Sequence, residues 1–349
     1  MTSTYRYRGR RAAFIENSAL RVTVLEEGGH VAEILDKRSG INPLWTPPWP
    51  SIEPSSYDRT KHHVYGSDVD ASLLAGIMGH NVCLDIFGPP STEEAAAGLP
   101  VHGEGPLVRY DIRQSEAELV MQALLPLAQL QFVRRLQLHD EALRIRETVE
   151  NLSGLDRAIG WTEHVTVGPP FLQPGHTAFR TSATRSKTFE QTFGADDYLR
   201  AGCEFDWPMA PCREGSTADL RILRPAAASS AFTSHLMDPS SDHAFFVAFS
   251  PEARLAFGYV WRRRDFPWLG IWEENRSRSH APWSGKTVAR GMEFGVSPMP
   301  EPRRAMIERG RLFDVPTFRW LPAATQVEVE YWVMAHHRET IPEALEWPG

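Results

Sequence analysis

The sequence contains little cysteine: Cys83, Cys203 and Cys212 are the only three in 349 residues, and their spacing is irregular. These cysteines give no disulfide framework and no Cys-x-x-Cys zinc pattern, and the His-Glu-x-x-His zinc pattern is missing as well. Apolar runs are also short, and none approaches the roughly 20 residues of a membrane-spanning helix. The N-terminal segment, Met1–Arg11, is basic and polar with no apolar segment behind it, so no signal peptide is expected. These absences predict a soluble cytoplasmic protein.

An excess of positive charge is missing as well. The net charge is −7 and the isoelectric point about 6.0, which gives no reason to expect nucleic acid or an anionic membrane as a partner. Hydrophobic residues make up 42% and charged residues 23%, the balance of an ordinary globular protein. No Gly- or Ser-rich linker and no break in composition divides the chain. We therefore expect residues 1–349 to form a single domain.

Long helical periodicity is absent, and alternation with a period of two residues dominates. Apolar and polar residues alternate through 20–24, Glu26–Gly29 makes a turn, and a second strand follows at Val31–Leu35. Residues 43–56 are rich in Pro and Trp and are expected to be a loop, and a short helix is expected at Ala71–Met78. Many short strands with Gly and Pro turns predict an all-β antiparallel sandwich or barrel. Further strands are expected at Leu107–Ile112, Glu118–Leu125, Ala128–Gln137, Ala142–Asn151, Ala158–Val167, Leu220–Leu223, His243–Phe249, Ala253–Trp261 and Val327–Val333.

The stretch 290–300 contains the strongest candidate for a catalytic group. Glu293 stands alone in an apolar run, with Gly291 and Gly295 on either side. An apolar strand of this kind is buried on both faces, and burial raises the pKa of a carboxyl group toward neutrality, which suits a general base. The alternative is a structural ion pair with a neighbour such as Arg290.

Two histidines lie in segments that could approach a ligand. His102 lies among small residues in 98–105, and His164 lies in a predicted strand that runs into a Gly-Pro-Pro turn. Either histidine alone could equally be structural. The chain also has 11 Trp, and these rings either line a cleft for sugar or fill a large β core.

Taken in order, these segments resemble the galactose mutarotase-like (aldose 1-epimerase) superfamily. The strand, Gly-Gly turn and strand of residues 19–40 match the start of that family. His102-Gly103 matches its first His, the segment from His164 to Phe171 matches its second, and Glu293 matches its base near the C-terminus. A Leu-Pro turn at Leu321-Pro322 leads into the last strand, as in the family. Phe294 replaces the family's usual Pro.

The resemblance implies a fold and an activity. The fold is a large antiparallel β-supersandwich, and the activity is interconversion of sugar anomers with Glu293 as base and His164 as acid. His102 would hydrogen-bond the sugar. The family's Arg or Asn-Arg segment before the first His is not evident, and Gly79-His80-Asn81 and Phe87-Gly88-Pro89 occupy that region instead. Asn81 is assigned to substrate binding, and Asp206 lies where relatives often place a sugar-binding acid. No metal or redox cofactor is implied.

A further segment has the residue types that sugar recognition needs. Trp272, Glu273, Glu274 and Asn275 combine an aromatic ring with acids and an amide, and we expect them on the same concave face as the two histidines. An exposed loop is the alternative.

Two other functions remain open. One is a non-catalytic carbohydrate-binding protein on the same scaffold. The other is a lyase or glycoside-acting enzyme, in which Glu293 would work with Glu273 or Glu274 as a second carboxylate. The implied partner is a monosaccharide or a sugar phosphate, and a homodimer is an assembly that the sequence leaves open.

Overall fold

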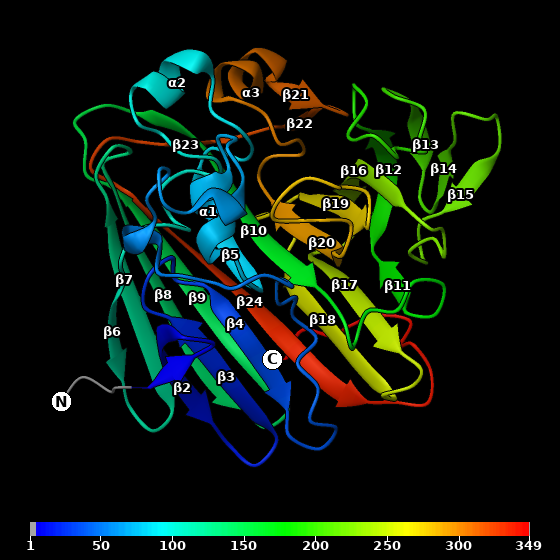
Figure 1. Cartoon of the computed structure of the whole chain (residues 1–349), viewed down its shortest axis with the longest axis horizontal. Helices are drawn as coiled ribbons and strands as arrows, with labels where there is room; N and C mark the ends of the chain where they lie inside the picture. The colour runs from blue at the N-terminus through cyan, green and yellow to red at the C-terminus, as the bar shows by residue number, and fades with distance from the viewer. Residues whose placement is uncertain (1–4, 349) are drawn as a thin grey trace.

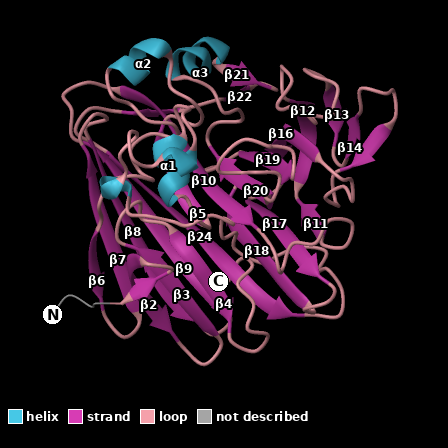
Figure 2. Cartoon of the chain, viewed as in Figure 1, coloured by secondary structure: helices cyan, strands magenta, loops and turns pink. Residues whose placement is uncertain are grey.

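The computed structural model describes residues 5–348 and consists mainly of two large antiparallel sheets that pack face to face (Figures 1 and 2). The first sheet has 12 strands and the second has eight. In spatial order the first sheet contains β1 (Arg6–Tyr7), β2 (Arg10–Glu16), β3 (Leu20–Leu25), β4 (Val31–Asp36), β5 (His80–Asp85), β10 (Arg157–Val167), β20 (Val288–Gly295), β19 (Trp268–Asn275), β16 (Ser229–Met237), β12 (Ala183–Thr188) and β13 (Glu204–Asp206), with β23 (Arg319–Leu321) also paired to β10. The second contains β11 (Ala178–Thr181), β17 (His243–Ser250), β18 (Leu255–Arg262), β24 (Gln326–His337), β9 (Ala142–Asn151), β8 (Leu130–His139), β7 (Glu118–Leu125) and β6 (Asp111–Gln114).

The remaining elements are short. Two small ribbons and three α-helices lie in the connections, and α2 and α3 lie close together at one end of the sandwich in Figure 1. No helix within residues 5–348 is long and apolar enough to cross a membrane. The ribbons are β14 (Met209–Pro211) with β15 (Thr217–Asp219) and β21 (Arg311–Leu312) with β22 (Val315–Pro316); the helices are α1 (Ala71–Gly76), α2 (Thr92–Ala96), α3 (Arg303–Arg309) and two 3₁₀ turns, Pro54–Ser56 and His63–Tyr65.

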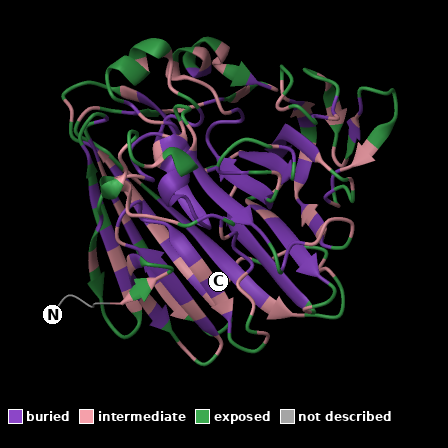
Figure 3. Ribbon diagram, viewed as in Figure 1, coloured by how far each residue is buried: buried purple, intermediate pink, exposed green. Residues whose placement is uncertain are grey.

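The two sheets differ in how their faces are covered. In β9 of the second sheet, buried Leu143 and Ile145 alternate with half-exposed Arg144 and Arg146, so one face packs on the core and the other meets solvent. In β5, β19 and β20 of the first sheet every residue is buried (Figure 3). The outer face of these strands is covered by a second apolar cluster that includes Leu73 and Leu74 of α1. The first sheet is therefore the middle layer of the molecule.

The strand pattern of the sequence is largely confirmed. The predicted segments Glu118–Leu125 and Ala142–Asn151 match β7 and β9, and the helix expected at Ala71–Met78 is α1. The predicted strand Leu220–Leu223 is wrong, because residues 220–221 form a turn and only Ile222 makes an isolated β-bridge, with Ala178. The predicted strand Leu107–Ile112 begins too early in the sequence. Leu107 N–H donates to the Glu104 carbonyl at 3.0 Å in a turn, and β6 begins only at Asp111.

Candidate functional site

Three polar residues form a row on the outer face of the first sheet. In the register of β5, β10 and β20, His164 is paired on one side with Asn81 and on the other with Glu293. Residues directly opposite each other in an antiparallel sheet point to the same face. Asn81, His164 and Glu293 therefore lie side by side, although they are far apart in the sequence.

His164 and Glu293 of this row form the floor of a pocket of about 410 Å³, which we call the aromatic cleft. Asn81 is fully buried beside His164 and does not line the pocket itself. The floor comes from strands, whereas the walls come from the connections around α1, from the segment that contains His102, and from residues 189–193 and 278–283. Aromatic rings dominate the walls, so the cleft is mainly apolar with a few polar groups, as is usual for a small-molecule site. The aromatic lining residues are Trp45, Phe87, Phe189, Phe193, Phe232, Trp272 and Trp283.

His164 and Glu293 are in direct contact at the floor. His164 Nε2 lies 3.1 Å from Glu293 Oε1, and the side chains are only 7% and 3% exposed. The other ring nitrogen, Nδ1, lies 3.2 Å from the hydroxyl of Thr166, so both nitrogens have a partner. Burial raises the pKa of Glu293 to about 8 and lowers the pKa of His164 to about 4. At neutral pH the pair therefore holds one proton and carries no net charge.

Two glycines leave room for the Glu293 side chain. A Cβ atom added at Gly291 would lie 2.3 Å from Glu293 Oε1, and one added at Gly270 would lie 3.5 Å from Glu293 Oε2 and 2.9 Å from the Phe232 ring. Any side chain at Gly291 would therefore displace the carboxylate. The Gly-x-Glu sequence around Glu293 reflects this close approach.

Polar atoms without partners point to a ligand. Both polar side-chain atoms of Asn81 and Nδ1 of His102 are buried and have no hydrogen-bond partner within the described chain. The His102 ring lies 5.2 Å from the His164 ring and stacks on Phe87, which places it in the wall of the aromatic cleft. A buried polar group without a partner costs free energy, so such groups call for an explanation. His102 lines the aromatic cleft, so a polar ligand there would give its ring nitrogen a partner.

One guanidinium lies at the edge of the aromatic cleft. Arg278 stacks over Trp283 at 4.5 Å and over Trp272 at 5.5 Å, and its Nε lies 3.5 Å from the Glu274 carboxylate. The only other charged lining residues, apart from the histidines and Glu293, are Asp68 and Asp70. Burial raises the pKa of Asp70. The cleft thus has no excess of positive charge.

A buried polar network lies directly behind the row, between the two sheets. Glu163 accepts hydrogen bonds from Arg134 at 2.7 Å, from Trp161 at 2.9 Å and from Tyr331 at 3.0 Å. Arg134 also donates to Glu147 at 2.6 Å. Burial raises the pKa of Glu147, and the Arg134 guanidinium opposes this shift. Because Glu163 and His164 are consecutive in β10, the network fixes the strand that presents His164.

Several residues expected in the site lie elsewhere. Glu273 points to the opposite face of β19, where it pairs with Arg290 at 3.1 Å, so Arg290 does not pair with Glu293. The Glu274 carboxylate is bonded to the backbone N–H of Ser277 at 2.7 Å, and the Asn275 amide donates to the Ala226 carbonyl at 2.9 Å.

Asp206 is also outside the aromatic cleft. It is exposed on β13, the last strand of the first sheet, and lines a separate surface depression. Of the expected sugar-binding residues, Trp272, Asn81 and His102 lie close to the His164–Glu293 pair. A second carboxylate supplied by Glu273 or Glu274 is not present beside Glu293.

Sequence reasoning missed most of the cleft wall. Trp45 and Trp283 stack with their ring centroids 6.3 Å apart, although they are more than two hundred residues apart in the chain. The Trp- and Pro-rich composition of residues 43–56 was the only signal for this wall. No pattern in the sequence indicated that Arg278 and Asp70 would line the aromatic cleft.

The fold matches that of known structures across nearly the whole chain. No family model matches the sequence, and no curated protein matches it. A proposed aldose 1-epimerase from Klebsiella pneumoniae aligns over 96% of this chain and 82% of its own, with a TM-score of 0.65 and 12% identity. A proposed aldose 1-epimerase from Escherichia coli K12 aligns over 93% and 99%, with a TM-score of 0.62 and 12% identity. A galactose mutarotase-like protein from Clostridium acetobutylicum aligns over 95% and 97%, with a TM-score of 0.60 and 13% identity. The chain therefore has the galactose mutarotase-like fold.

Proposed function

We propose that the protein interconverts the anomers of an aldose, and that His164 and Glu293 carry out the proton transfers. The observation that carries the proposal is their 3.1 Å contact at the floor of an aromatic cleft, beside the unpartnered side chain of Asn81. Aromatic rings bind the apolar faces of sugars, and Asn81 and His102 can bind hydroxyl groups. The names of the structural neighbours point to the same chemistry.

The proton held by the pair is enough for the whole reaction. Transfer of this proton from Glu293 Oε1 to His164 Nε2 gives a carboxylate and an imidazolium without changing the net charge. The carboxylate then removes the proton of the anomeric hydroxyl while the imidazolium protonates the ring oxygen, and the ring C–O bond breaks to give the open aldehyde. The aldehyde group rotates, and the reverse transfers close the ring on the other face. No metal ion or redox cofactor takes part.

The charges of the aromatic cleft favour a neutral sugar over a sugar phosphate. Arg278 is the only Lys or Arg in the lining, its guanidinium lies beside Glu274, and two aspartates accompany it. A phosphate carries close to two negative charges at pH 7 and is usually bound by several cationic or N–H donors. We therefore propose an unphosphorylated aldose as the substrate.

Substitution of the catalytic pair provides the test. Glu293→Gln keeps the shape of the side chain and removes the proton acceptor, so we expect anomer exchange to slow by about 10²–10⁴-fold, and His164→Asn to have a similar effect. Exchange would be measured by NMR over a panel of free and phosphorylated aldoses.

His102→Asn should weaken sugar binding and also lower the rate of anomer exchange, because the proposed role of His102 is partly to position the sugar.

Glu273→Gln is the matched control, because Glu273 lies on the opposite face of the neighbouring strand. Full activity of Glu293→Gln would overturn the assignment of the base. A wild-type protein that binds an aldose of the panel but accelerates exchange of none would instead be a carbohydrate-binding protein.

A further inference from the structure

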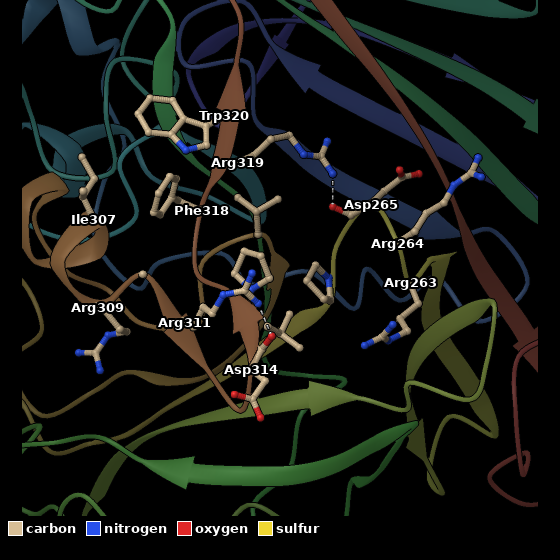
Figure 4. A pocket seen from close by; sticks show the side chains of 15 residues that line it. Arg263, Arg264, Asp265, Ile307, Arg309, Arg311, Asp314, Phe318, Arg319 and Trp320 are labelled. Atoms are coloured by element: carbon tan, nitrogen blue, oxygen red, sulfur yellow. Dashed lines mark hydrogen bonds between the residues drawn. The ribbon is translucent and has the colours of Figure 1, made fainter.

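A second and larger cavity lies apart from the aromatic cleft. Its volume is about 950 Å³, and it lies between the turn after β18, residues 263–267, and the segment 307–320 (Figure 4). We call it the arginine cleft, because Arg263, Arg264, Arg309, Arg311 and Arg319 line it. None of these residues lines the aromatic cleft. The mechanism proposed above does not use them.

Four of the five guanidiniums form no close ion pair. Within residues 5–348, Arg263, Arg264, Arg311 and Arg319 have no ion pair within 4.0 Å, and the hydrogen bonds of Arg263, Arg311 and Arg319 go to backbone carbonyls. The Asp265 carboxylate interacts with Arg319 and Arg264 only at longer range. Arg311 donates to the Asp314 carbonyl at 2.6 Å, and Arg319 donates to the Asp265 carbonyl at 2.7 Å. Each guanidinium has five N–H donors, so most of the donors remain available. This concentration of free positive charge is unexpected in a chain with a net charge of −7.

Arg309 differs from the other four. It forms ion pairs with Glu190 at 2.8 Å and with Glu301 at 2.9 Å, and these carboxylates raise its pKa. Its charge is already offset, so it anchors the end of α3. Two aspartates, Asp265 and Asp314, also line the cleft, which leaves the positive charges in the majority.

An exposed aromatic pair forms another part of the arginine cleft. Trp320 is 59% exposed, whereas the other ten tryptophans are buried or half-buried. Phe318 packs against it with ring centroids 5.5 Å apart and an interplanar angle of 78°. Figure 4 shows this pair and the Arg263–Arg264 pair on opposite sides of the cleft. Two perpendicular rings form a corner rather than a slot between parallel faces, and a corner suits a puckered sugar ring better than a flat nucleobase.

We propose that the arginine cleft binds an acidic oligosaccharide, with one sugar ring on Trp320 and the carboxylate groups of the chain on the free arginines. Guanidinium and carboxylate groups pair through two parallel hydrogen bonds, which matches the fork geometry of Arg to sugar acids. The site is distinct from the aromatic cleft and does not depend on the reaction proposed for it.

The test is binding of a short oligogalacturonate to the full chain, measured by isothermal titration calorimetry at low and at moderate salt. A neutral malto-oligosaccharide of the same length is the matched ligand. We expect the acidic oligosaccharide to bind, its affinity to fall as salt rises, and the neutral one to bind at least tenfold more weakly. The double substitution Arg264→Gln and Arg311→Gln should lower the affinity by about tenfold or more, and Trp320→Ala should do the same.

Arg113→Gln is the control variant, because Arg113 is exposed on β6 of the other sheet and has no ion pair in the described chain. It should bind the oligogalacturonate as the wild type does. Thermal unfolding of each variant shows whether it folds, and Trp320→Phe gives a second aromatic variant that should keep most of the affinity. Failure of the oligogalacturonate to bind, equal binding of the neutral ligand, or unchanged affinity in the folded double variant would overturn the proposal. Tighter binding of a single-stranded oligonucleotide, lost in the same variants, would overturn it in favour of nucleic acid.

Discussion

At the scale of single residues, the candidate site depends on Glu293, a buried carboxyl group that has no Arg or Lys partner. Glu293 is 2% exposed, and its contact is with His164, whose own pKa is lowered by burial. The usual arginine partner is absent because Arg290, three residues earlier in the strand, points to the other face and pairs with Glu273. Burial alone raises the pKa of Glu293, and this makes the group a stronger base when it ionises.

The pH dependence of activity should follow the single proton of the pair. His164 is protonated below its pKa of about 4, and Glu293 loses its proton above its pKa of about 8. Only the singly protonated pair can supply both an acid and a base, so kcat/KM should be constant between these values and fall on both sides. NMR measurement of anomer exchange from pH 3.5 to 9.5, with the uncatalysed rate subtracted, checks this. A rate that keeps rising beyond pH 9 would contradict the pair mechanism.

The close approach of Gly291 to Glu293 gives a sharper prediction. In Gly291→Ala the new methyl group would clash with Glu293 Oε1, so the carboxylate must move while the strand remains. A displacement of about 1 Å at a catalytic group costs on the order of 10²-fold in rate. Gly154→Ala is the control, because an added Cβ there meets no atom within 4 Å. Unchanged exchange rates in Gly291→Ala would show that the position of Glu293 is not critical.

At the scale of elements, β10 joins the candidate site to the core. Successive side chains of a strand point to opposite faces, so His164 faces the aromatic cleft and Glu163 faces the network between the sheets. The strand is therefore held from behind by charged and hydroxyl groups rather than by apolar packing alone. A shift of one residue in its register would exchange the two sets of side chains.

The network should be costly to break. Arg134→Met leaves Glu163 and Glu147 buried without their cation, and loss of one partner of a buried ion pair destabilises a protein by about 3–5 kcal/mol. The neighbouring Arg135 is 48% exposed and lies 3.9 Å from Glu118, so Arg135→Met should cost about 1 kcal/mol or less. Urea unfolding of both variants measures the difference. Equal stabilities would mean that the network contributes little.

The elements also show which parts of the site could be predicted from sequence. The strands could be predicted because the alternation of apolar and polar residues is a local property of the sequence. Glu293 could be predicted as a site residue because it is a single acidic residue in an apolar run. The four residues 272–275 were expected to face the sugar together, but they lie in β19, so only Trp272 and Glu274 share the face of Glu293. The stacking of Trp45 on Trp283 could not be predicted, because it depends on how two distant loops fold over the sheet.

At the scale of the whole molecule, the two sheets share one core. The main apolar cluster takes residues from both, among them Val165 and Phe294 of the first sheet and Ile145 and Tyr259 of the second. Neither sheet could bury its inner face without the other. That residues 1–349 form a single domain stays a prediction, which an unfolding experiment can test.

Thermal unfolding should therefore be one cooperative transition. Loss of either sheet would expose the inner face of the other, so no half-folded state is expected to be stable. Differential scanning calorimetry checks this, together with near-UV circular dichroism, to which the buried tryptophans contribute. Two separated transitions would contradict the single domain.

The division of the aromatic cleft into a strand floor and loop walls has a consequence for evolution and for engineering. The floor residues His164 and Glu293 are fixed by hydrogen-bonded register and tolerate no insertion, whereas most of the walls belong to connections that can change length. Under the proposed function, new sugar specificities would arise by exchanging loops while His164 and Glu293 stay in place. A combinatorial library restricted to residues 66–77, 189–193 and 278–283 would change these walls and leave the His164–Glu293 pair unchanged.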